Sequence, residues 1–101
     1  MKKPILATPQ FNHWMRRLKD TRGKARISAR IRKVSLGNMG DIKPVGGRVS
    51  ELRIHTGPGY RVYLTVRTSD VVILLVGGSK RTQDKDIKVA RAMARQYQEE
   101  P

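Results

Sequence analysis

Apolar residues recur at helical spacing in two stretches of the N-terminal half, and each stretch predicts a helix with one buried face. The positions that share a face are Phe11, Trp14, Met15 and Leu18 in the first stretch and Ile27, Ile31 and Val34 in the second. The pair Thr8-Pro9 is typical of a helix start, and Gly23 is expected to separate the two helices. A short apolar segment at residues 4–7 precedes both helices and can form a strand.

The pattern changes in the middle of the chain. Residues 37–47 contain four glycines and a proline and predict a loop. Apolar and polar residues then alternate over 49–55 and over 60–67, which is typical of two strands. The turn-forming residues 56–59 lie between these strands, so they predict an antiparallel pair.

The last third of the chain predicts a central strand and a closing helix. Residues 71–76 are continuously apolar, as in a strand covered on both faces, and Gly77-Gly78 is expected to end it. Helical spacing returns over residues 82–99. The predicted order β-α-α-β-β-β-α is that of an α+β fold in which a helical hairpin packs on a small, mainly antiparallel sheet.

One face of the predicted sheet gathers basic and aromatic side chains. The alternate residues that point away from the apolar side are Glu51, Arg53, His55, Arg61 and Tyr63. A short turn with Leu52 and Val62 both facing inward sets Arg53 opposite or diagonal to Arg61. Guanidinium groups bind phosphate oxygens and aromatic rings stack on bases, so this face predicts a phosphate-binding site. The alternative is an ordinary solvated face of charged residues.

Charge narrows the class of partner. The 101 residues, expected to form one domain over 1–101, include 22 basic and 8 acidic ones, which gives a net charge of +14. Such an excess predicts a polyanionic partner, namely nucleic acid, an acidic protein or an anionic membrane surface. Membrane binding is the weakest of these, because so small a domain needs its apolar stripes for its own core.

Several kinds of chemistry are excluded by the residues present. The chain has no cysteine, which rules out disulfides and cysteine-type zinc sites, and its two histidines cannot form a metal cluster by themselves. No catalytic triad or phosphate-binding loop motif is present. The longest apolar run, residues 71–76, is far shorter than the roughly 20 residues of a membrane span. With no secretory signal pattern at the N-terminus, we expect a cytoplasmic protein.

Motifs in order along nearly the whole chain resemble the HigB-like branch of the RelE/ParE toxin superfamily. They include Phe11-x-x-Trp14-x-x-x-Leu18, Ala25-Arg26-Ile27-x-x-Arg30-Ile31, Gly37-Asn38-x-Gly40-Asp41, Gly57-Pro58-Gly59-Tyr60-Arg61 and Leu74-Leu75-x-Gly77-Gly78-x-Lys80. The resemblance implies a RelE-like fold and the toxin of a type II toxin–antitoxin pair. RelE-like members cleave mRNA, typically on the ribosome and without a metal, whereas ParE-like members inhibit DNA gyrase.

The resemblance thus implies a translation-inhibiting, metal-independent endoribonuclease, an mRNA interferase, with no cofactor. The first alternative is a ParE-like inhibitor of DNA gyrase without nuclease activity. A second alternative, which rests on the charge alone, is a basic nucleic-acid-binding module that is not toxic.

The expected site residues combine the resemblance with the predicted sheet face. The expected catalytic residues are Arg61, which matches the arginine of the family's Gly-Tyr-Arg motif, Arg53 and Lys80, which fall in corresponding neighbourhoods, and His55, whose imidazole suits proton transfer near neutral pH. The expected nucleic-acid-binding residues are Arg81, Tyr63, Lys43 and Gln83. No metal site is expected.

The expected partners follow from the toxin interpretation. They are a cognate antitoxin, a helix-turn-helix protein encoded by a neighbouring gene, and mRNA together with the ribosome. Operator DNA is expected to bind only through the toxin–antitoxin complex, and no membrane partner is expected.

Overall fold

The computed structural model describes residues 2–68 and 70–98, so the predicted helix end at Glu99 lies outside the described residues. The elements are β1 (Ile5–Ala7), α1 (Pro9–Arg17), α2 (Thr21–Ser35), β2 (Ile42–Pro44), β3 (Ser50–Ile54), β4 (Tyr60–Val66), β5 (Val72–Ser79), the 3₁₀ helix η1 (Lys80–Thr82) and α3 (Gln83–Gln98). This is the predicted α+β order with one further strand, β2, and it is compatible with a RelE-like fold.

The strands form one mixed sheet in the order β1-β5-β4-β3-β2. Strand β1 pairs with β5 in parallel, while the other three pairings are antiparallel. The prediction of a loop over 37–47 was wrong at β2, which pairs Ile42 with Leu52. The half-buried Ile42 packs against the core beside α1 and α2, and this burial holds three residues of a glycine-rich segment in the sheet.

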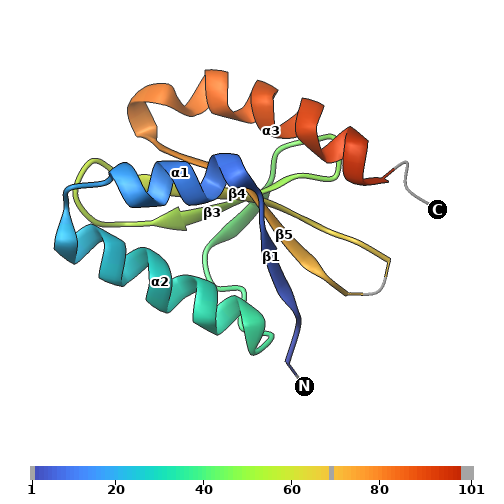
Figure 1. Ribbon diagram of the computed structural model, residues 1–101, viewed down its shortest axis with the longest axis horizontal. Helices are drawn as coiled ribbons and strands as arrows, with labels where there is room; N and C mark the ends of the chain where they lie inside the picture. Colours follow the sequence, from blue (N-terminus) through green and yellow to red (C-terminus); the bar gives the residue numbers. More distant parts are fainter. Residues whose placement is uncertain (1, 69, 99–101) are drawn as a thin grey trace.

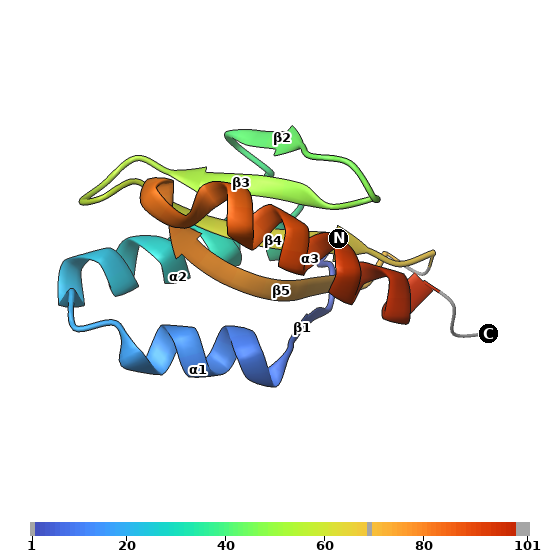
Figure 2. The same cartoon turned by 90° about the horizontal axis from the view of Figure 1, so that it is seen from above.

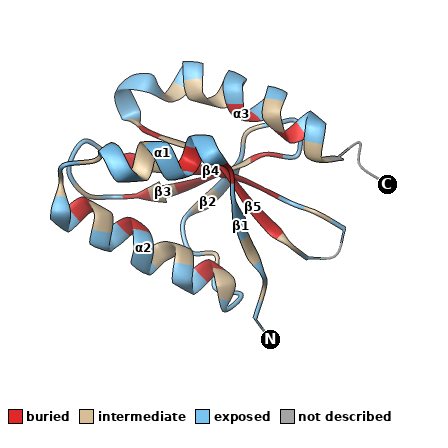
Figure 3. Cartoon of the chain, viewed as in Figure 1, coloured by how far each residue is buried: buried red, intermediate tan, exposed pale blue. Residues whose placement is uncertain are grey.

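Helices cover both faces of the sheet. Figure 1 shows α2 on one side and α3 on the other, with the strands between them, and Figure 2 gives the same layers from above. The α1/α2 face buries Phe11, Ile27, Val34, Leu52, Ile54, Tyr60, Val62, Leu64, Val72 and Leu74. The α3 face buries Val49, Tyr63, Ile73, Leu75, Ala90 and Ala94. The buried residues accordingly follow the strands and the inner sides of the helices (Figure 3).

The helix starts follow local capping chemistry. The Thr8 hydroxyl accepts the Phe11 N–H at 3.0 Å and donates to the Leu75 carbonyl at 2.6 Å, so it caps α1 and ties it to β5. The Asp20 carboxylate caps α2 by accepting the Gly23 N–H at 2.9 Å. Gly23 does not separate the helices as predicted but lies in the first turn of α2. A Cβ there would be 2.6 Å from both Asp20 and Tyr60, so the residue is glycine for lack of space.

The Gly77-Gly78 pair also differs from its prediction, because it continues β5 to Ser79 and does not end it. A Cβ on Gly77 would lie less than 3.0 Å from the Trp14 ring, and one on Gly78 less than 3.0 Å from the Asp86 carboxylate. The two glycines therefore let α1 and α3 approach the same strand end from opposite faces.

None of the helices within the described ranges combines the length and the apolar character needed to cross a bilayer.

Candidate functional site

Two arginines lie directly opposite each other on neighbouring strands. Arg53 of β3 pairs with Arg61 of β4, and Arg61 pairs in turn with Gly78 of β5. Directly paired residues point to the same face of a sheet, so both side chains lie on the α3 face. Their strand neighbours Leu52 and Val62 pack on the α1/α2 face. The predicted register and facing of the arginine pair are confirmed.

Helix α3 covers more of this face than the alternation predicts. Glu51 and Tyr63 are fully buried, although both were expected to avoid the core. The small side chains of Ala90 and Ala94 allow α3 to pack closely on this part of the sheet. The Tyr63 ring is thereby closed to stacking on a base, which corrects its expected role in nucleic-acid binding. The Arg61 side chain is 11% exposed and that of Arg53 is 30% exposed, so the site opens at Arg53.

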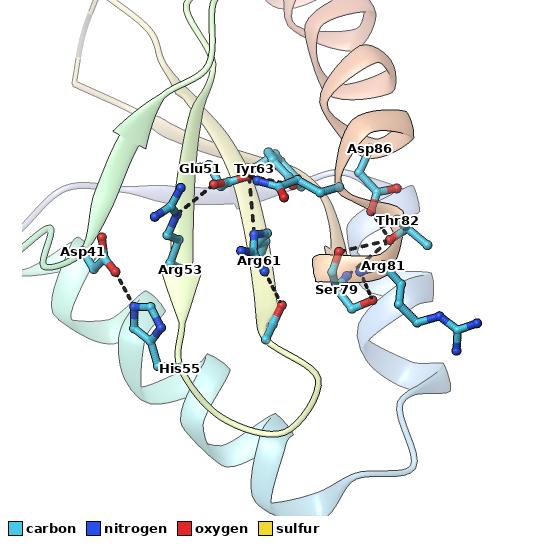
Figure 4. Close-up of polar contacts among 12 residues, drawn as sticks. Asp41, Glu51, Arg53, His55, Arg61, Tyr63, Ser79, Arg81, Thr82 and Asp86 are labelled. Atoms are coloured by element: carbon cyan, nitrogen blue, oxygen red, sulfur yellow. Dashed lines mark hydrogen bonds and ion pairs between the residues drawn. The ribbon is translucent and has the colours of Figure 1, made fainter.

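Glu51 joins the arginines into one network. Its Oε1 accepts the Nε–H of Arg53 at 3.0 Å. Its Oε2 accepts the Tyr63 hydroxyl and the Gln83 amide, each at 2.9 Å, and lies 3.6 Å from Arg61 Nε. Figure 4 shows the two arginines side by side on neighbouring strands, with Glu51 and Tyr63 next to them.

The network sets the charge of Glu51. Burial raises the pKa of its carboxyl, but hydrogen bonds from Arg53, Gln83 and Tyr63, with the charge of Arg61, leave that pKa below its usual value. The pKa of the Tyr63 phenol is raised by burial and by its hydrogen bond to Glu51. The site therefore holds an ionised carboxylate beneath two guanidinium groups at neutral pH.

Two further predicted residues lie beside the pair, where the chain passes from β5 into α3. Gln83 belongs to the Glu51 network. Lys80 is exposed, and its Cβ lies 3.6 Å from the point that a Cβ added to Gly59 would occupy. The carbonyl of Gly59 accepts a 2.7 Å hydrogen bond from Arg61 Nη1. Gln83 therefore joins the network of the two arginines through Glu51, and Lys80 lies near the Gly59 turn that Arg61 contacts; the roles expected for Gln83 and Lys80 stay predictions.

The other predicted residues lie at the margins. Lys43 is exposed on β2, opposite Glu51, and Arg81 is exposed in η1. His55 follows the end of β3, has a side chain that is 74% exposed, and shares a hydrogen bond with Asp41 (Figure 4). That hydrogen bond is the main cause of a lowered pKa at Asp41.

A basic groove lies next to His55. It has a volume of about 290 Å³ and is lined by Arg26, Ala29, Arg30, Lys33, Ile54, His55 and Thr56. Arg30 donates to the backbone carbonyls of Arg53 and Met39, so it links α2 to β3 and to the segment before β2. Within the described ranges no group of three or more acidic or histidine side chains is arranged to hold a metal ion.

Neither Glu51 nor Arg30 had a predicted role. The signal for Glu51 was its place on the same strand face as both arginines, because an acidic side chain between two cations predicts an ion-pair network. No sequence signal marked Arg30 among the many basic residues of α2, since its carbonyl partners come from the folded chain.

Comparisons with known proteins show the family to which the chain belongs. Residues 13–97 match the family model described as "Phage derived protein Gp49-like (DUF891)". A protein of Haemophilus influenzae called "Uncharacterized protein" is 51% identical over 92 residues, covering 91% of this chain and 93% of that protein. The chain belongs to the phage-derived Gp49-like family, a toxin–antitoxin-associated family related to the RelE-like toxins.

Proposed function

We propose that this protein is the toxin of a type II toxin–antitoxin pair and that it cleaves mRNA as a metal-independent, ribosome-associated endoribonuclease. The observation that carries the proposal is the arginine pair, with Arg53 opposite Arg61 at the open end of the α3 face. Lys80 lies near Gly59, whose carbonyl accepts a hydrogen bond from Arg61, and a net charge of +14 draws polyanions toward the protein.

The reaction suited to such a site is attack of the RNA 2′-hydroxyl on the adjacent phosphorus. The 2′-hydroxyl gives up its proton as its oxygen bonds to phosphorus, and the bond to the 5′-oxygen breaks as that oxygen takes up a proton, which leaves a 2′,3′-cyclic phosphate and a 5′-hydroxyl. Negative charge builds on the phosphate oxygens in the transition state. Planar guanidinium forks held in a partly dry site stabilise that charge strongly.

His55 is the proposed proton-transfer group. Its hydrogen bond to Asp41 gives the imidazole the carboxylate partner that orients histidines in many acid–base sites. Its exposed position next to the basic groove leaves it within reach of a bound RNA strand. Arg81 and Lys43, exposed on either side of the pair, are proposed to hold neighbouring phosphates.

The proposed partners are the mRNA on the ribosome and a helix-turn-helix antitoxin. An acidic or amphipathic surface on the antitoxin would cover part of the basic surface and neutralise it. Operator DNA is proposed to be bound by the complex through the antitoxin.

The test measures mRNA cleavage in a translating extract. Ribosome-free RNA fragments treated with EDTA serve as the control for metal dependence, and DNA supercoiling by gyrase is measured in parallel. Arg61→Lys keeps the charge but loses the fork, so cleavage should fall by about 10²–10³-fold. Arg95→Lys, the same change on an exposed residue of α3, is the matched control and should cleave like the wild type.

Intact mRNA together with blocked supercoiling would reject the nuclease and favour a gyrase inhibitor. Intact mRNA together with normal supercoiling, and no growth arrest on expression, would favour a non-toxic nucleic-acid-binding module.

A further inference from the structure

Glu51 has no part in the proposed proton or phosphate chemistry, yet it is the most heavily bonded side chain of the site. It is fully buried and accepts hydrogen bonds from Arg53, Tyr63 and Gln83. The fourth group aimed at it is Arg61 Nε, a buried nitrogen without a hydrogen-bond partner within the described ranges, 3.6 Å from Oε2. Both guanidinium groups thus turn their Nε edges toward one carboxylate.

This arrangement decides which donors of the arginines face outward. A guanidinium group has five N–H donors in a fixed plane, so holding its Nε edge fixes the direction of the Nη groups. Arg61 Nη1 donates to the Gly59 carbonyl at 2.7 Å. Within residues 2–68 and 70–98, Arg61 Nη2 and both Nη groups of Arg53 have no acceptor. These are the donors left for a phosphodiester.

We propose that Glu51 is a positioning residue that fixes the Nε edges of Arg53 and Arg61 so that their Nη groups converge on the scissile phosphate of a bound RNA. Its catalytic consequence rests on the proposed function. Two guanidinium groups directly opposite each other repel, and without the buried carboxylate the more exposed Arg53 would turn toward solvent. Tyr63 and Gln83 keep the carboxylate itself in place by filling the lone pairs of Oε2.

The variant Glu51→Gln separates positioning from simple charge attraction, because positioning predicts slower RNA cleavage and charge attraction does not. The change removes a negative charge, leaves 22 basic and 7 acidic residues, and raises the net charge from +14 to +15. If charge alone governed the site, RNA would bind more tightly and cleavage would not fall. Positioning predicts that a non-cleavable 2′-deoxy oligonucleotide binds at least as tightly while kcat falls roughly 10- to 100-fold, less than the about 10²–10³-fold loss of a direct donor.

Asp70→Asn is the matched control. Asp70 has an exposed side chain, pairs with Lys3 at 3.8 Å and lies in the turn between β4 and β5, beyond the end of β4 that is far from Arg61. The change brings the same net charge of +15 with an equally isosteric side chain, and asparagine tolerates the φ of 63° at this position. We expect its kcat to equal that of the wild type. Unchanged kcat in Glu51→Gln, or equal losses in both variants, would overturn the proposal.

A second measurement needs neither a variant nor activity. Hydrogen exchange of the arginine Nε–H groups by NMR in the wild-type protein should be much slower at Arg53 and Arg61 than at the exposed Arg95. Exchange at Arg53 as fast as at Arg95 would overturn the positioning role. Because this measurement uses the wild-type protein, it still tests the proposal if Glu51→Gln fails to fold. A wild-type protein that cleaves no RNA but protects both Nε–H groups would reject the proposed function and still support the geometry assigned to Glu51.

Discussion

The two faces of this sheet use alternate residues of the same strands and differ sharply in chemistry. On the α1/α2 face, β3 and β4 present Leu52, Ile54, Val62 and Leu64 to an apolar core. On the α3 face the intervening residues are Glu51, Arg53, Arg61 and Tyr63. Each face also contains one tyrosine–carboxylate hydrogen bond, Tyr60 to Asp20 at 2.8 Å and Tyr63 to Glu51 at 2.9 Å.

The comparison teaches how a small domain combines a core with a charged site. The α1/α2 face is closed by two helices and holds the larger apolar core, so the α3 face, with a smaller core of its own, can also hold charged groups that are costly to bury. Helix α3 then covers part of the charged face, which places Glu51 in a dry environment while Arg53 stays partly open. A change on the first face should therefore reduce stability alone, and a change next to the arginines on the second face should reduce activity as well as stability.

Leu52→Ala should give the largest loss of stability. Leu52 is fully buried between the helical hairpin and the sheet, so the smaller side chain leaves a cavity and should lower the free energy of unfolding by about 2–5 kcal/mol. Urea unfolding followed by circular dichroism measures this. The folded fraction should keep its RNA cleavage rate. Loss of cleavage in fully folded Leu52→Ala would contradict the claim that the α1/α2 face contributes to stability and not to activity.

Alanine substitutions at the two adjacent glycines compare the two faces at one strand end, because Gly77 faces α1 and Gly78 faces α3. Gly77→Ala should push on Trp14 and Gly78→Ala on Asp86, and each should lower the free energy of unfolding by about 1–3 kcal/mol through overpacking. Gly78 pairs with Arg61, so its variant should also lose cleavage activity, whereas Gly77→Ala should not. Thermal melts and single-turnover cleavage of both variants at a temperature where both are folded measure the contrast.

Arg61→Ala should cost stability as well as activity. The side chain is nearly buried, and its loss leaves the Glu51 carboxylate with fewer compensating groups, worth about 1–2 kcal/mol. Adding Glu51→Gln to Arg61→Ala should recover part of that loss, because the buried charge is then gone as well. A double-mutant cycle of unfolding free energies measures the coupling. Strictly additive effects would show that the two side chains do not interact.

The smallest effect concerns acid stability on the α1/α2 face. Hydrogen bonds from the Gly23 N–H and from Tyr60 lower the pKa of Asp20, so its contribution to stability is present above the unfolded value of 3.8 and is lost as pH falls through the folded value. Asp20→Asn should therefore melt at a lower temperature near neutral pH, with the difference from the wild type shrinking below about pH 4. A difference that grows toward acid would contradict the assignment.

The sequence predicted those parts of the molecule that follow from periodicity. Because strand side chains alternate with a period of two, the facing of Leu52 and Val62 also fixed the facing of Arg53 and Arg61. The start of α1 followed from Thr8-Pro9 in the same local way.

What the sequence did not reveal depends on contacts between distant segments. The burial of Glu51 and Tyr63 requires α3 to lie across their face, and nothing local to either residue indicates that cover. The same holds for Gly77 and Gly78. Their sequence predicts the end of a strand, and only the folded structure shows that Trp14 and Asp86 pack closely over them. Strand β2 was missed because its pairing with β3 outweighs a local composition typical of loops.

The parallel pairing of β1 with β5 has a consequence for the order of events during synthesis. The first strand finds its partner 67 residues later, at Val72–Leu74, and Gln83 of the Glu51 network follows after that. Closing so long a loop is among the slow steps in folding, and the arginine pair itself is local to β3 and β4, so the site is completed only after Gln83 and helix α3 have been made and packed over Glu51. A truncated or still-growing chain would therefore carry the basic residues without the finished site.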